Sequence, residues 1–144
     1  MSVAAILAGK GSLVATITPE ATVNGLLAEL SKRGIGALVV SSDGRKVLGI
    51  VSERDVVKVL HERGASALDA PVSSIMTRML HTVSPSTSIS DVMVMMTEKR
   101  VRHLPVLDKD ALVGIISIGD AVKHRIDDLE HERSALVGYI QSGG

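Results

Sequence analysis

The sequence lacks cysteine, tryptophan and phenylalanine, and it has one tyrosine, Tyr139. Without cysteine there is no disulfide framework and no thiolate metal site. The shortage of aromatic rings removes the stacking platforms that hold single-stranded nucleic acid, and 16 acidic against 16 basic residues leave no net charge to attract a polyanion. No apolar run approaches the length of a membrane span, and Met1 to Ala8 lack the basic start of a secretory signal. We therefore expect a cytoplasmic protein with neither nucleic acid nor membrane as partner.

One stretch of the sequence occurs twice. Residues 49–55 read GIVSERD, and residues 114–120 read GIISIGD. In both copies an apolar run reaches a serine, and an aspartate follows three residues later at the start of helix-forming sequence. This pattern is typical of a strand that ends at a helix N-terminus. Such a junction leaves backbone N–H groups free and favours negative charge.

The duplication extends over most of the chain, because residues 16–40 match residues 82–106 at a shift of 66 positions. The shift falls to 65 after the predicted hairpin, which places a one-residue deletion in an exposed turn, where deletions are tolerated. The periodicity predicts helices over 2–7, 22–33 and 54–63, a break at 9–11, and strands over 13–17, 37–40 and 47–51. Residues 64–71 are small and turn-rich, as in a linker.

The predicted class is therefore α/β: two β-α-β-β-α repeats, related by a pseudo-twofold axis, pack through their sheets and are followed by a C-terminal helix. We expect the first repeat over 8–66, a linker over 67–72, the second repeat over 73–130 and a helical extension over 131–144.

The paired motifs resemble the tandem cystathionine-β-synthase (CBS) domain pair, and above all its small stand-alone bacterial members. The resemblance rests on Thr16-x-x-Pro19 with Thr82-x-x-Pro85, on the strands at 36–40 and 102–106, and on the two Gly-x-x-Ser-x-x-Asp segments. It implies a regulatory, non-catalytic module that binds an adenosine derivative between its lobes and forms a homodimer.

In that family each cleft draws on both repeats: the aspartate takes the ribose hydroxyls, the residue before proline and the central strand meet adenine, and basic groups meet phosphate. The first cleft is accordingly expected to combine Ser52, Arg54, Asp55, Ser84, Arg102 and His103. The second is expected to combine Thr18, Gly36, Ala37, Ser117 and Asp120, with Lys123 as a possible phosphate partner.

The two clefts differ in charge. Where the first has Arg54, Arg102 and His103, the second has glycine or alanine. A carboxylate suits a cis-diol, and an arginine fork suits phosphate. The first cleft is therefore expected to take a nucleotide, AMP before NAD(H), ATP and S-adenosylmethionine. The second is left open: an uncharged adenosine, the far end of a longer ligand, or nothing.

Simpler interpretations remain for these motifs. Each Ser-x-x-Asp also fits a helix capping box, and Ser88-x-x-Asp91 is expected to be a cap alone. His103 is interpreted either as a structural residue or as a ligand contact, and the other four histidines as surface residues. No nucleophile–base set indicates an enzyme. The alternative function is a ligand-free structural or protein-interaction module that dimerises.

The C-terminal segment has a rhythm close to a heptad repeat, which favours packing across a dimer over folding back on its own lobe. The apolar positions are Val122, Ile126, Leu129, Leu136 and Ile140. The sequence gives no identity for a downstream protein partner.

Overall fold

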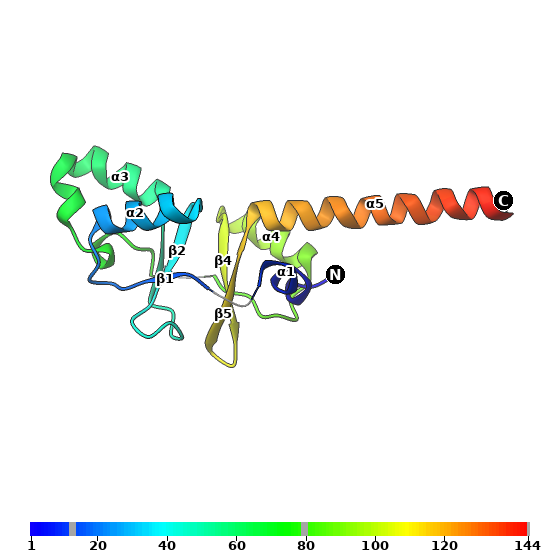
Figure 1. Cartoon of the computed structure of the whole chain (residues 1–144), viewed down its shortest axis with the longest axis horizontal. Helices are drawn as coiled ribbons and strands as arrows, with labels where there is room; N and C mark the ends of the chain where they lie inside the picture. Colours follow the sequence, from blue (N-terminus) through cyan, green and yellow to red (C-terminus); the bar gives the residue numbers. More distant parts are fainter. Residues whose placement is uncertain (12–13, 79–80, 144) are drawn as a thin grey trace.

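The computed structural model describes residues 1–11, 14–78 and 81–143, which form two lobes and a long helix that extends away from the second lobe (Figure 1). The first lobe contains β1 (Thr16–Ile17), α2 (Val23–Arg33), β2 (Ala37–Val40), β3 (Gly49–Ser52) and α3 (Glu53–Arg63), followed by 3₁₀ turns at Gly64–Asp69 and Val72–Ser74. The second contains α1 (Val3–Lys10), α4 (Ile89–Lys99), β4 (His103–Asp108), β5 (Ala111–Ser117) and the start of α5 (Ile118–Gly143). The mixed α/β class is as predicted.

The strand pairings repeat from lobe to lobe. Ala37 pairs with Ser52 across β2 and β3, and His103 pairs with Ser117 across β4 and β5. β1 runs parallel to β2, with Ile17 opposite Val40, and the matching pair in the second lobe, Val83 with Val106, is also parallel. The first strand of the second repeat is thus reduced to one bridge. The strand predicted over 13–17 is limited to Thr16–Ile17, and Leu13 lies outside the described residues.

The two hairpin turns carry the one-residue difference between the repeats. In the first lobe the Asp43 carboxylate accepts hydrogen bonds from the backbone N–H groups of Arg45 and Lys46, at 2.8 and 2.9 Å. This turn delays the return strand to Gly49, two residues later than predicted. In the second lobe both turn residues, Lys109 and Asp110, have positive φ, which is typical of a tight two-residue hairpin.

The helix ends follow the predicted signals in α2 but not in α4. Thr22 caps α2, since its Oγ1 accepts a hydrogen bond from the Gly25 N–H at 3.0 Å, and Gly34 ends the helix with φ of +63°. Ser88 caps α4 in the same way through the Asp91 N–H, which confirms its expected role. At the far end, however, Arg100 adopts the left-handed conformation, with φ of +54°, at the position equivalent to Gly34.

A further repeat is visible that the sequence analysis missed. The segment before each repeat packs on the other lobe: the Val3 N–H donates to the Thr87 carbonyl at 2.9 Å, and the Val72 N–H donates to the Ala21 carbonyl at 2.7 Å. Both valines are fully buried. The sequence signal is SVAAIL at 2–7 and PVSSIM at 71–76, which match at a shift of 69 positions.

The glycine that opens each repeated motif makes room for these exchanged segments. A Cβ on Gly49 would lie 2.8 Å from both Met76 Sδ and the Thr77 carbonyl oxygen. On Gly114 it would collide with the Leu7 side chain. Close approach of a neighbouring segment is a recognised reason for glycine within a strand.

The predicted break at 9–11 is wrong for Gly9 and Lys10, which belong to α1, because the buried Val3 and Ile6 hold this helix on the second lobe. The stretch expected to be a linker contains a 3₁₀ turn over Gly64–Asp69, in which Ala67 is buried. The helix α5 continues without interruption through residues 130 and 131. The domain boundaries drawn from the sequence stay a prediction.

None of the helices in the described ranges is both long enough and apolar enough to cross a membrane.

Candidate functional site

A cavity of about 290 Å³ lies where the first lobe faces the second, at the lower end of the volumes typical of small-molecule sites. One side comes from the β3–α3 junction, and the other comes from the segment that joins α4 to β4. Its lining residues are Gly36, Ile50, Ser52, Glu53, Arg54, Asp55, Thr77, His81, Arg100, Val101, Arg102 and His103.

Asp55 and Ser52 form the capping box of α3. Asp55 Oδ2 accepts hydrogen bonds from the Ser52 N–H at 2.8 Å and from Ser52 Oγ at 3.0 Å. The Asp55 N–H donates to Ser52 Oγ at 3.5 Å, and the Glu53 N–H donates to the Gly36 carbonyl at 3.0 Å. Two amides of the first turn are therefore already engaged, contrary to the expected free N–H groups. In the described part of the chain, Oδ1 of Asp55 accepts no hydrogen bond, so capping leaves one carboxylate oxygen for a ligand.

Basic groups line the side of the cavity formed by the second lobe. Arg100 and Arg102 lie there, and Arg54 faces them from the first turn of α3. Among residues 1–11, 14–78 and 81–143, none of these three guanidinium groups forms an ion pair. Because guanidinium presents several donors in a planar fork, these side chains are suited to an anionic ligand. No group of three or more histidine and acidic residues within those ranges is arranged to hold a metal ion.

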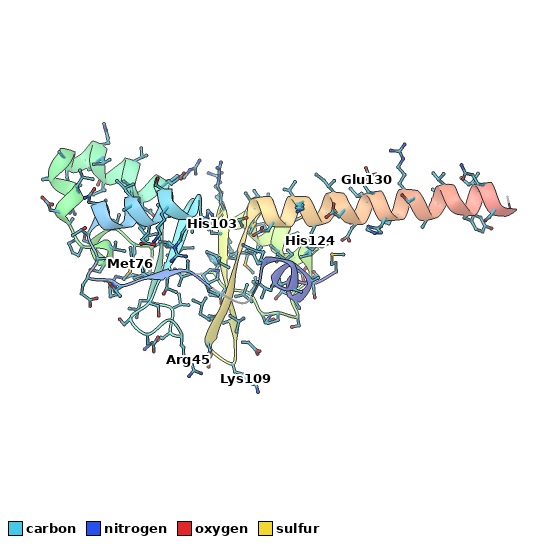
Figure 2. The ribbon with its side chains drawn as sticks, viewed as in Figure 1. Arg45, Met76, His103, Lys109, His124 and Glu130 are labelled. Carbon is cyan, nitrogen blue, oxygen red and sulfur yellow. The ribbon has the colours of Figure 1, made fainter. Side chains whose placement is uncertain are left out.

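His103 is half-buried near the junction of the two lobes (Figure 2). Burial is the main cause that lowers its pKa below 6.5, and the nearby positive charges of Lys10 and Arg102 lower it further. Asp120 and Glu53 act in the opposite direction and do not compensate. His103 therefore lies within the electrostatic reach of both predicted clefts and is held in its neutral form.

The second predicted cleft is built differently. Asp120 caps α5, as its Oδ2 accepts a hydrogen bond from the Ser117 N–H at 2.9 Å. The same oxygen accepts a second hydrogen bond from Lys10 Nζ at 2.7 Å. Burial raises the pKa of Asp120, but the hydrogen bonds from Lys10 and Ser117 outweigh it, and the pKa lies below its usual value.

The structure brings together most of the first predicted site. Five of its six residues line the cavity; the exception is Ser84, whose hydroxyl interacts with Ser86 and Thr87 in its own loop. Gly36, assigned to the second cleft, lines this cavity instead. Ala37 is buried, whereas Thr18 and Lys123 are exposed and do not line it. The ligand role of all these residues stays a prediction.

Six lining residues were not predicted from the sequence. Ile50 and Glu53 lie within the repeated motif, Val101 lies next to Arg102, and the other three are Thr77, His81 and Arg100. The sequence did contain a signal for Arg100, because the 66-residue shift places it opposite Gly34. An arginine is unusual at a helix C-cap whose backbone has the left-handed conformation. Thr77 follows the segment that matches residues 2–7, and its position against β3 becomes predictable once that shorter repeat is found. His81 was correctly interpreted as exposed but also lines the cavity, and no motif in the sequence indicates it.

A duplicated α/β unit with a charged cleft between its lobes defines the class of this protein. The family model of the CBS domain matches residues 13–62 and 72–127. The chain belongs to the CBS-domain family.

Individual relatives agree with this assignment. The chain is 35% identical over 130 residues to the mitochondrial CBS domain-containing protein CBSX3 of Arabidopsis thaliana, a match that covers 88% of this chain and 63% of the plant protein. A crystal structure of a CBS-domain containing protein from Agrobacterium tumefaciens is 40% identical, with a TM-score of 0.83 over 87% of this chain and 99% of that chain. The crystal structure of CBSX2 in complex with AMP has the same fold, with a TM-score of 0.71 and 24% identity over 88% of this chain and 96% of that chain.

We predict that the pKa of His103 lies below the ordinary histidine value of 6.5. Its folded-state pKa lies below 6.5, so the unfolded chain binds the proton more readily. The contribution of neutral His103 to the free energy of unfolding is thus complete above about pH 6.5. It is lost as the pH falls through the lower pKa that His103 has in the folded state. Proton NMR titration of the histidine ring resonances, assigned with His103→Gln, measures this directly. A His103 midpoint at or above 6.5 contradicts the prediction.

Arg100→Gly should stabilise the fold, because glycine removes the penalty of a left-handed backbone at the end of α4. We expect a gain of about 1 kcal/mol in the free energy of unfolding, measured by urea denaturation. The reciprocal variant Gly34→Arg, at the equivalent end of α2, should lose a similar amount. If Arg100→Gly is destabilising, the side chain contributes packing that outweighs the backbone strain.

Proposed function

We propose that this protein is a cytoplasmic, non-catalytic regulatory module that binds an adenine nucleotide in the cavity lined by Asp55. AMP is our first ligand, followed by NAD(H), ATP and S-adenosylmethionine. The observation that carries the proposal is the combination, in one cavity, of the Asp55 carboxylate and three guanidinium groups. Among the described residues, one oxygen of this carboxylate accepts no hydrogen bond and none of the guanidinium groups forms an ion pair.

The cavity supplies three kinds of group. The free Oδ1 of Asp55 can accept hydrogen bonds from a ribose cis-diol, because an ionised carboxylate is an acceptor only. Arg54 beside it, and Arg100 and Arg102 across the cavity, supply charge-assisted donors for phosphate. Ile50 and Val101 also line the cavity and provide apolar surface for a base, which suits a chain with almost no aromatic rings.

A solved relative supports the choice of ligand. CBSX2, which has this fold, was crystallised in complex with AMP. A monophosphate is also the smallest ligand in our series, and it suits a cavity of about 290 Å³ better than a dinucleotide does.

Binding of the nucleotide would be transmitted as a change in the position of one lobe relative to the other. The cavity takes residues from both lobes, so a ligand in it bridges them, with Asp55 on one side and Arg102 on the other. A ligand shifts a conformational equilibrium only by its differential affinity for the two states. Bound nucleotide therefore favours the closed arrangement, and an unidentified downstream protein would recognise that arrangement.

We further propose that two copies associate through α5. The stretch of α5 around Glu130 extends beyond both lobes (Figure 2), and its apolar side chains are exposed, Leu129 at 46% and Leu136 at 61%. Their spacing is that of a two-helix seam. A second copy of the chain, which carries the same seam, is the partner that covers it.

Nucleotide binding is tested with a thermal-shift panel of AMP, ADP, ATP, NAD⁺, NADH and S-adenosylmethionine. A ligand at about a hundred times its dissociation constant adds about 2.7 kcal/mol to stability, so the melting temperature of the parent should rise by several degrees with AMP. Asp55→Ala should abolish this rise, and Asp120→Ala should keep it.

The matched control is Asp91→Ala. Asp91 occupies the same Ser-x-x-Asp position at the start of α4 but lies outside the cavity. Its loss removes a favourable negative charge from the first turn of α4 but keeps the Ser88 cap, and the response to AMP should remain. A cooperatively melting parent that responds to no nucleotide favours the alternative, a ligand-free interaction module.

Leu129→Asp should dissociate the dimer, because a carboxylate cannot be buried unpaired in an apolar seam. Sedimentation equilibrium should report twice the chain mass for the parent and the chain mass for the variant. His131→Asp introduces the same charge on the far side of α5 and should leave the dimer intact. A monomeric parent, or a dimeric Leu129→Asp, would rule out the α5 seam.

A further inference from the structure

Lys10 contacts Asp120, the aspartate predicted to belong to the second cleft. It lies in the last turn of α1, and its Nζ donates hydrogen bonds to Asp120 Oδ2 at 2.7 Å and to the Ile115 carbonyl at 3.0 Å. The helix that carries it is firmly held, since Val3 and Ile6 are buried in the core of the second lobe. The ammonium group is therefore directed at Asp120 by a packed helix and not by a loose tail.

Within residues 14–78, the first lobe shows no counterpart of this contact. There the equivalent carbonyl, that of Ile50, accepts its hydrogen bond from the backbone N–H of Thr77 at 2.9 Å. The equivalent carboxylate, Asp55, forms no ion pair with any residue that the structure describes. Both aspartates accept a hydrogen bond from the N–H of their own serine, so the cation is what distinguishes them.

This difference affects the group to which a ribose diol would bind. A diol binds a carboxylate by donating hydrogen bonds, and the Lys10 ammonium group already donates to Oδ2 of Asp120 and opposes its negative charge. Within the described residues Oδ1 of Asp120 accepts no hydrogen bond, so a ligand must displace Lys10 or share the carboxylate with it. The pair is partly accessible, with the Lys10 side chain 38% exposed, so the contact opposes binding without sealing the cleft.

We propose that Lys10 is an internal competitor for the Asp120 carboxylate, which makes the second cleft the weak one and limits each chain to one nucleotide in the first cleft. The inference rests on the proposed function, because it assumes that these aspartates receive ribose hydroxyls. It assigns to α1 a role in ligand selection, which neither the repeated motif nor the residues of the cavity suggest.

Isothermal titration calorimetry with adenosine and AMP tests the proposal on the full-length chain. Asp55→Ala isolates the second cleft, and Lys10→Met removes the ammonium group while it keeps an unbranched side chain. In the Asp55→Ala background, Lys10→Met should tighten adenosine binding by about fivefold or more. The gain for AMP should be smaller, because the same substitution removes a positive charge that attracts phosphate.

Two control variants accompany this comparison. Lys10→Arg keeps the cation and should leave the second cleft weak. Lys32→Met removes a lysine from the last turn of α2, outside the cavity, and should change neither affinity. With Asp55 intact, Lys10→Met should raise the stoichiometry from one AMP per chain to two. Melting curves of each variant confirm that it is folded.

The outcomes separate this inference from the proposed function. If the parent binds one AMP and Lys10→Met leaves the second cleft unchanged, Lys10 is not a competitor, while the nucleotide module stands. If the parent binds nothing but Lys10→Met binds adenosine, the role of Lys10 stands and the first cleft has been misassigned. If neither the parent nor any variant binds, both are overturned.

Discussion

The fold depends on an exchange between the two lobes, in which the short segment that precedes each repeat packs on the other lobe. Each lobe completes its core with a short segment that precedes the other repeat in the chain, α1 for the second lobe and the Val72 turn for the first. Glycine at 49 and 114 allows this contact, because a side chain there would meet the incoming segment. The two lobes are thus held together by the crossing of the chain as well as by the surface between them. The cavity lies between lobes that are positioned in this way.

Much of this architecture could be predicted because duplication makes weak signals reinforce one another. The ends of α2 followed from its apolar spacing and from Gly34, and the equivalence of Ser52 with Ser117 followed from the 65-residue shift. What escaped prediction had a physical cause. Gly9 sits in a helix because the buried face of α1 outweighs its low helix propensity. His81 and Lys10 lie in loops or helix ends between the matched segments, so only the path of the chain in space brings them to the clefts.

The two clefts illustrate how a symmetric backbone carries unequal chemistry. Equivalent positions hold Gly34 and Arg100, and Gly36 and Arg102, so positive charge has gathered in one of the two repeats. The strained backbone at Arg100 fits this view, since strain at a single residue is tolerated where a side chain is needed in place. Duplication supplies two similar sites, and a few substitutions suffice to give them different tasks.

The unbroken course of α5 has a mechanical consequence. This helix begins at Ile118, beside Ser117 and Asp120, and continues for 26 residues to Gly143, a length of about 39 Å at 1.5 Å per residue. The far end of such a rod moves further than its base when the rod tilts. By that geometry a tilt of about 5° at the base would displace the tip by about 3 Å. The length of α5 alone would therefore enlarge a small adjustment near Asp120 into a several-ångström displacement at the end of the helix.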